Sequence, residues 1–180
     1  AEAMRERGDM VEIALYEQEE IGCDVMQAAP VIHSAWEQVR VESTTDGEVT
    51  RQQYRLGDRT LRSVHRRSLV GGIQSHATVE YPVKDGEDLR LFLDMLSDMR
   101  FTWQPGRYEA LVDRVGERGI VHANMPATPV MQLILRWTGV EHFTYLLADE
   151  PALVRRVLDV LHDQAVGQYR MLLDHDVAVD

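Results

Sequence analysis

The fold is decided by the stretch Gly119–Asp180, whose sequence is GIVHANMPATPVMQLILRWTGVEHFTYLLADEPALVRRVLDVLHDQAVGQYRMLLDHDVAVD. It begins with a short apolar run, Ile120–Met125, passes through a proline-rich turn into helical patterns, and ends with a second short run, Val177–Asp180. A strand followed by helices and another strand is the building block of parallel α/β folds. Because such folds carry their chemistry at the carboxyl ends of their strands, we expect functional residues where these two runs end.

Three places in the chain have a helical pattern that leads directly into a short apolar run, and we call each of them a helix-to-strand join. A helical pattern over the first 20 residues stops at Gly22, and the apolar run Cys23–Ala28 follows it directly. The segment Arg118–Val121 is a second join of the same kind, and the entry into Val177–Asp180 is a third. Three such joins favour a fold of repeating βα units over one in which strands and helices are segregated.

Residues 36–81 interrupt this pattern and predict an antiparallel β excursion. Asp46-Gly47 is a strong signal for a tight hairpin turn. Val49–Tyr54 can return from that turn as the partner strand, and Gln74–Tyr81 predicts a further extended segment. The excursion is too polar and too strand-like to be a helix of a repeating βα unit.

Four helices are predicted after the excursion. Asp85 is a capping residue for a helix that runs to about Met99, and a second helix begins near Pro105. Pro129–Thr138 is apolar nearly all round, which is typical of a helix that is buried or covered. Pro151 opens a long last helix. Its predicted core face consists of Leu153, Val157, Leu161, Ala165, Tyr169 and Leu172.

Composition excludes several classes of protein. Apolar residues make up 44% of the 180 residues and charged residues 27%, as in ordinary globular proteins. The net charge of −11 argues against a nucleic-acid-binding surface, which needs a basic face. Cys23 is the single cysteine, so no intrachain disulfide can form and a reducing cytoplasm is the simplest setting. No apolar run approaches the roughly 20 residues that span a bilayer, so we expect no membrane partner.

Three phrases of the sequence resemble the uroporphyrinogen decarboxylase superfamily. Val79–Leu89 is similar to its "eyPvk-x-x-eDL" phrase, and Gly139–Val154 resembles its "G-x-e-x-f … l-x-D-P-e-x-v" helix pair. Asp176–Asp180 is similar to the "aD-x-i-x-x-x-D" strand that follows, and Ile21–Asp24 also fits the "lG-x-D" strand entry. Together these phrases extend over most of the chain.

The resemblance implies a TIM-barrel fold built of parallel βα units. A TIM barrel typically has about 250 residues. Residues 1–180 are therefore expected to form a single domain that is the N-terminal part of such a barrel. A partial barrel leaves an unpaired strand at its edge, which is an aggregation hazard. We accordingly expect either a longer chain or a partner, such as a second copy, that covers this edge.

The resemblance also implies the activity. Members of the superfamily bind tetrapyrroles or act in methyl transfer involving corrinoid proteins. The N-terminal arginine-rich signature of the decarboxylases is not present, and Asn124–Thr128 keeps only the proline and the threonine of their "GaPwT" phrase. This favours methyl transfer involving a corrinoid (cobalamin) or a small methylated substrate. Decarboxylation of a tetrapyrrole is the first alternative, and a non-catalytic binding or assembly member of the family is the second.

Four residues are candidates for the site. Asp180, at the end of its strand, is a candidate catalytic carboxylate that could orient a substrate or act as a base, although a helix cap is the simpler structural role. His122, in the middle of its strand, is a candidate acid, base or ligand, or a hydrogen-bonded core residue. Asn124 lies two residues further on the same side, and Gln27 is the equivalent polar residue of the first strand. Both are candidates for binding substrate, and His33 is a weaker one.

Metal and nucleotide chemistry find no support in the residues present. The histidines lack metal-ligand spacings such as HxxxH or HEXXH, and no phosphate-binding glycine motif or GxSxG is present. We expect no metal site within this chain. The zinc of the methyltransferase branch, held by His and Cys, would have to come from residues beyond 180.

Overall fold

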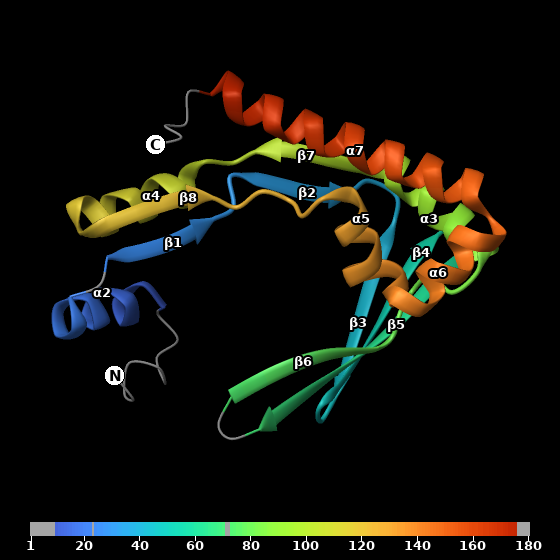
Figure 1. Cartoon of the computed structure of the whole chain (residues 1–180), viewed down its shortest axis with the longest axis horizontal. Helices are drawn as coiled ribbons and strands as arrows, with labels where there is room; N and C mark the ends of the chain where they lie inside the picture. The colour runs from blue at the N-terminus through green and yellow to red at the C-terminus, as the bar shows by residue number, and fades with distance from the viewer. Residues whose placement is uncertain (1–9, 23, 71–72, 176–180) are drawn as a thin grey trace. The chain divides into compact units, whose positions relative to one another are not determined.

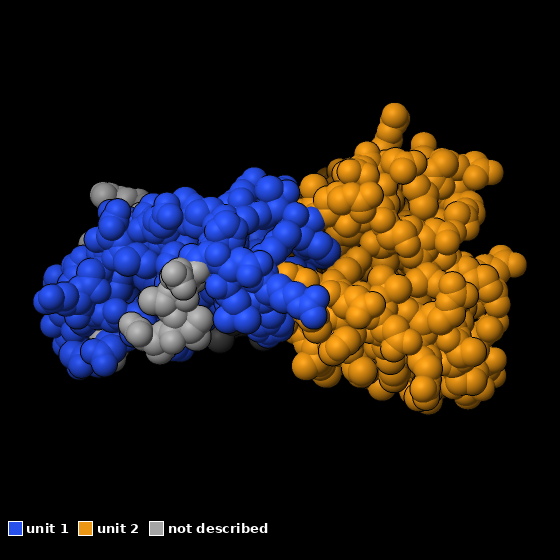
Figure 2. Space-filling view, turned by 90° about the horizontal axis from the view of Figure 1, so that it is seen from above, with its two compact units in different colours: residues 1–33, 101–125, 168–180 blue, residues 34–100, 126–167 orange. Residues whose placement is uncertain are grey.

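The computed structural model describes residues 10–22, 24–70 and 73–175 (Figure 1). It is a mixed α/β structure that divides into two compact units, coloured separately in Figure 2. Unit 1 consists of residues 1–33, 101–125 and 168–180, and unit 2 of residues 34–100 and 126–167. No helix within the described residues is long and apolar enough to cross a membrane.

Unit 1 contains a parallel pair of strands, β1 (Val25–Ala29) and β8 (Gly119–Ala123). The register runs without interruption from Val25 opposite Gly119 to Ala29 opposite Ala123. The two apolar runs at the ends of the first and second joins therefore lie side by side in the same direction, as predicted. The third run, Val177–Asp180, lies outside the described residues. The parallel sheet that the structure describes has two strands, so the full barrel stays a prediction.

Helices precede both strands of the parallel pair. α2 (Met10–Ile21) ends at Gly22, whose φ of 75° suits a glycine at a helix end, and leads into β1. α4 (Gly106–Val115) and a 3₁₀ turn, η1 (Gly116–Arg118), lead into β8. A helix that enters each parallel strand is the βα arrangement expected from the sequence.

The two faces of this parallel pair differ in burial. Val25 and Ala29 are buried, as is Val115 on α4, so one face of the pair is covered. On the other face, Met26 and Ile120 are 67% and 59% exposed. Side chains alternate between the faces of a strand, and every second residue of β1 and β8 therefore lies on an open surface.

Unit 2 is built around a four-stranded antiparallel sheet in the order β3-β4-β5-β6. Its strands are β3 (Arg40–Asp46), β4 (Val49–Leu56), β5 (Arg59–Val70) and β6 (Ile73–Glu80). Asp46 pairs with Val49, so the first turn is Gly47-Glu48, and Leu56 pairs with Arg59 around Gly57-Asp58. Gly47 and Gly57 have φ of 57° and 63°, the left-handed conformation that tight hairpins require. The antiparallel excursion predicted at about 36–81 is confirmed.

Helices supply the rest of unit 2. They are α3 (Gly86–Asp98), α5 (Pro129–Gln132), a π-helical turn η2 (Leu133–Thr138), α6 (Gly139–Asp149) and α7 (Pro151–Asp174), whose last residues belong to unit 1. The Asp85 carboxylate accepts hydrogen bonds from the Glu87 and Asp88 backbone N–H groups, both at 2.9 Å, which confirms the predicted cap. Phe92 is fully buried and its ring centroid lies 4.2 Å from that of Trp137.

The core of unit 2 joins the sheet to these helices. Its buried members include Val39 and Leu61 from the sheet side, Phe92 and Met95 from α3, and Val157 from α7. The helices that supply these residues are apolar on one side, and that side packs against the sheet. The core face predicted for α7 is confirmed except at Tyr169, which is 48% exposed.

Pro129–Thr138 is helical as predicted, but the expectation that this helix is buried or covered is wrong for much of its surface. Leu133 is buried, but Val130 and Leu135 are 41% and 56% exposed. The segment passes from α5 into the π-helical turn, where the Thr138 hydroxyl donates to the Leu133 carbonyl at 3.0 Å. A π turn closes with i→i+5 bonds. A helical segment that is apolar nearly all round covers only the side that packs against its neighbours, so its other apolar side chains stay exposed.

Two short strands were not predicted. β2 (Ile32–Trp36) and β7 (Met99–Trp103) form a second two-stranded sheet. β7 follows α3 without a turn residue between them, so its start carries no glycine or proline signal. Its end matters for the site, because Gln104 follows it directly.

Candidate functional site

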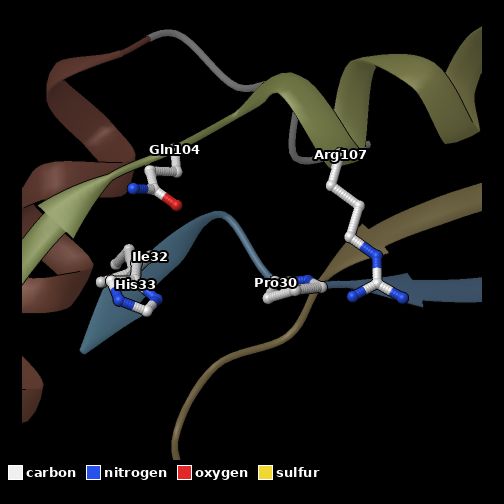
Figure 3. Close-up of a pocket in the computed structure, with 5 residues that line it drawn as sticks. All are labelled: Pro30, Ile32, His33, Gln104 and Arg107. Carbon is white, nitrogen blue, oxygen red and sulfur yellow. The ribbon is translucent and has the colours of Figure 1, made fainter. Parts of the chain in front are cut away.

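Unit 1 contains a cavity of about 200 Å³ beside the end of β1 (Figure 3). The residues that line it are Pro30, Ile32, His33, Gln104 and Arg107. Pro30 directly follows β1, and His33 is the second residue of β2. Gln104 directly follows β7, and Arg107 lies in the first turn of α4. The cavity is thus formed where several elements begin and end.

Backbone hydrogen bonds fix the position of this cavity relative to the parallel strands. The Asn124 N–H donates to the Ala29 carbonyl at 2.8 Å, so the pairing of β1 with β8 ends at the level of Pro30. The Gln104 N–H donates to the Val31 carbonyl at 2.8 Å and holds the segment that follows β7 against the one that follows β1. The cavity therefore lies at the carboxyl end of the parallel pair, where α/β folds bind their ligands.

The polar groups that line the cavity favour the binding of an anion. In Figure 3 the Arg107 guanidinium lies on the side of Pro30, and the Gln104 amide and the His33 ring lie on the other side. None of the described lining residues is acidic. Arg107 forms no ion pair with a carboxylate of the described residues, and it sits at the helix end where the backbone dipole is positive. A guanidinium, an amide and an imidazole around one cavity are donors that suit a carboxylate or phosphate.

Of the residues predicted from the sequence, His33 lines this cavity, whereas His122, Asn124 and Gln27 do not. His122 and Asn124 are both exposed, on the open side of β8. Gln27 is half-buried and pairs with Val121, on the opposite side of the sheet from His122. The structure thus brings His122 and Asn124 to one face and does not bring Gln27 to it. Asp180 lies outside the described residues.

Sequence reasoning missed Gln104 and Arg107 and gave His33 little weight. The missed signal is the segment Gln104-Pro105-Gly106-Arg107, which links the end of a strand to the start of a helix. Acidic residues are favoured in the first turn of a helix and basic ones are not. An arginine at that place, directly after a strand, could have indicated an anion site had β7 been recognised.

The described groups whose pKa values are shifted belong to unit 2, and none of them lines this cavity. Burial would raise the pKa of the Asp98 carboxyl, but hydrogen bonds from the N–H groups of Val39, Gln38 and Glu37 outweigh it and leave the pKa below its usual value. Burial raises the pKa of Asp88 and of Tyr54. These shifts reflect how unit 2 is held together and do not mark a catalytic pair.

Two further observations bear on the kind of site. Within the described residues, no group of three or more His, Cys, Asp or Glu side chains could hold a metal ion. No family model, no curated protein and no solved structure matches the chain. The function must therefore be argued from the cavity, its position in the fold and the sequence phrases.

Proposed function

We propose that this chain is the N-terminal part of a uroporphyrinogen-decarboxylase-like enzyme that takes part in methyl transfer, with a corrinoid or a small methylated compound as the methyl donor or acceptor. The cavity at the end of β1 would bind an anionic group of the substrate. One observation carries this proposal: the cavity lies at the carboxyl end of two parallel strands and is lined by Arg107, Gln104 and His33 without a described acidic residue.

The chemistry of these side chains supports binding of a carboxylate. The planar guanidinium of Arg107 can donate two parallel hydrogen bonds to the two oxygens of a carboxylate. The amide of Gln104 and the ring of His33 can donate from the opposite side. Together they would orient a substrate whose reactive end points away from the cavity, over the open face of β8 where His122 and Asn124 lie.

The size of the cavity limits what it holds. Pockets for drug-sized ligands occupy about 300–1,000 Å³, and this cavity has about 200 Å³. It suits a small acid or one carboxylate-bearing side group of a larger molecule. This favours a small methylated substrate over a whole tetrapyrrole, and the cavity is also too small for a corrin ring. A corrinoid, when bound to a partner protein, supplies the metal centre that carries the methyl group.

The roles of the other candidates follow from their places. His122 is proposed as an acid or base and Asn124 as a hydrogen-bonding group for the substrate. Asp180 stays a proposed catalytic carboxylate. Gln27, on the covered side of β1, is better suited to hold the strand than to touch a substrate.

Two alternatives each have an observation in their favour. The Arg107 guanidinium would also suit a carboxylate of a tetrapyrrole, as decarboxylation requires. The exposed Met26 and Ile120 side chains would suit a binding or assembly role. The alternatives separate by ligand: a decarboxylase binds uroporphyrin, whereas an assembly protein binds neither uroporphyrin nor cobalamin.

Calorimetric titration of the full-length protein with cobalamin, uroporphyrin and acetate tests the proposal. We expect acetate to bind, and Arg107→Gln to weaken its binding by about tenfold or more, because the variant removes the guanidinium charge from the described lining of the cavity. Arg170→Gln is the matched control, since Arg170 is an exposed arginine on the unit 1 part of α7 that does not line the cavity. Equal binding by the wild type and Arg107→Gln would contradict the proposal.

A further inference from the structure

Two arginines of unit 2 stand directly opposite each other in the antiparallel sheet. Arg40 on β3 pairs in register with Arg55 on β4, and both side chains are exposed. Residues directly opposite on neighbouring strands have their Cβ atoms about 5 Å apart, and like charges in that arrangement are destabilising. The pairing is therefore unfavourable unless something negative lies between the two guanidinium groups.

No carboxylate of the described residues supplies that negative charge. Arg59, Lys84, Arg90 and Arg100 each form an ion pair with a carboxylate, whereas neither Arg40 nor Arg55 does so with a described residue. Glu42 lies two residues from Arg40 but opposite Gln53, and Asp58 lies in the turn after Arg55. Neither forms an ion pair with Arg40 or Arg55. By contrast, Arg59 on the next strand pairs with Asp94 at 2.7 Å.

A cavity lies at this arginine pair. It has a volume of about 370 Å³ and is lined by Gln38, Arg40, Arg55, Leu56 and Gly57. The segment that carries Gln38 and Arg40 is held in place by Asp98. The Asp98 carboxylate accepts hydrogen bonds from the N–H groups of Gln38 and Val39, at 2.8 and 2.9 Å. The two guanidinium groups and the Gln38 amide are thus donors that line one cavity. The backbone next to Gln38 and Arg40 is held by the hydrogen bonds to Asp98.

We propose that this cavity binds the phosphate group of a small molecule between Arg40 and Arg55. A phosphomonoester carries a charge of about −1.5 to −2 near neutral pH, which matches the two permanent positive charges of the arginines. A single carboxylate would leave one of them uncompensated. The guanidinium fork also fits the spacing of phosphate oxygens, and the volume lies within the range of small-molecule sites.

A small molecule suits the site better than a polyanion. The net charge of the chain is −11, and a polyanion such as nucleic acid would be repelled by that charge away from the immediate site. The site shares no lining residue with the cavity of unit 1. It does not depend on the methyl-transfer proposal.

The test is thermal unfolding of the full-length protein with inorganic phosphate, compared with sodium chloride at equal ionic strength. A ligand that binds only the folded state raises Tm with its concentration. We expect phosphate to raise Tm, and both Arg40→Gln and Arg55→Gln to weaken phosphate binding by about tenfold or more. Without phosphate, each variant should be no less stable than the wild type, because one of two opposed like charges is gone.

A matched variant shows whether an effect is specific to the Arg40–Arg55 pair. Arg51 lies on the same face of β4, four residues from Arg55, but opposite Thr44. Arg51→Gln removes the same charge without touching the pair and should leave phosphate binding unchanged. The proposal is overturned if phosphate has no effect beyond chloride, if Arg51→Gln weakens binding as much as Arg40→Gln, or if an oligonucleotide displaces phosphate at lower concentration.

The pH dependence of binding provides a second readout. Arginine stays charged throughout the accessible range. A phosphomonoester loses its second negative charge as the pH falls through about 6, and inorganic phosphate does so somewhat above that value. We expect phosphate binding to weaken as the pH falls below that value. Binding that is independent of pH across this interval would contradict a site built for the dianion.

Discussion

Replacing Gly119 by alanine tests whether β1 and β8 pair as described. Gly119 is the first residue of β8 and lies opposite Val25 on β1. A Cβ atom built on Gly119 would lie 2.0 Å from the Val25 carbonyl oxygen, and 2.7 and 2.8 Å from the Val25 carbonyl carbon and Cα. Its φ of 168° is ordinary extended backbone, so the steric contact alone requires a glycine here.

The size of the effect follows from what must move. The obstructing atoms belong to the backbone of β1, so no side-chain rotation can relieve the contact, and the strands must separate at this end. Overpacking of this kind costs about 1–3 kcal/mol, and a buried backbone group left without its partner costs about 1–3 kcal/mol more. We expect Gly119→Ala to lower the free energy of unfolding by about 2–4 kcal/mol.

Urea denaturation of the wild type and two variants measures this. Gly106→Ala is the matched control, because Gly106 is the first residue of α4, in the same unit, and a Cβ there meets nothing within 4 Å. Alanine is the better helix former, so this control should be neutral or stabilising by up to about 1 kcal/mol. If Gly119→Ala is as stable as Gly106→Ala, the described register of β1 and β8 is wrong.

Two further predictions concern unit 2. The Asp98 carboxyl has a lowered pKa in the folded state. Its ionised form therefore stabilises the fold at pH values above about 3.9, the pKa of an aspartate in the unfolded chain. This contribution is lost as the pH falls through the lower pKa of the folded state. Asp98→Asn should therefore be less stable than the wild type at pH 7, with a difference that shrinks in acid; a constant difference in urea midpoints across pH would refute this. Phe92→Ala should lower the free energy of unfolding by about 3–5 kcal/mol, because Phe92 is fully buried against Trp137. Leu135→Ala, at a side chain that is 56% exposed, should cost much less, and equal losses in calorimetry would contradict the described core.

Much of the local structure could be predicted because its signals are short-range. The Asp46-Gly47 turn and the Asp85 cap depend on residues within one turn of each other, and both are as predicted. The parallel pairing of β1 and β8 followed from two similar helix-to-strand joins. Each of these signals is complete within a few residues of sequence, so no knowledge of distant contacts was needed.

Other features depend on contacts that no local pattern contains. β5 is 12 residues long and carries Arg62, Arg66 and Arg67, so it shows no clear apolar alternation, and its place in the sheet comes from pairing with β4 and β6. Gln27 lies on the covered side of β1, opposite to the side that carries His122. A register that differs by one residue would move Gln27 to the other face, and the sequence alone does not fix the register.

The cavity residues show the same limit at the site itself. His33 and Arg107 come from segments far apart in the sequence, and they line one cavity because β1 ends beside the start of α4. The sequence predicts functional residues at the carboxyl ends of the strands, and the cavity of unit 1 lies beside the end of β1, although His122, Asn124 and Gln27 do not line it. The side chains that line it could be identified only once β7 and the start of α4 were located in space.

The central claim is that an anion binds at the carboxyl end of the parallel pair, and an NMR titration with acetate tests it most directly. We predict that the backbone amide signals shifted by acetate in a ¹⁵N-labelled sample of the full-length protein include those of His33, Gln104 and Arg107, and that Arg107→Gln abolishes these shifts. Acetate-induced shifts that are absent from these residues, or that persist in Arg107→Gln, would contradict the claim.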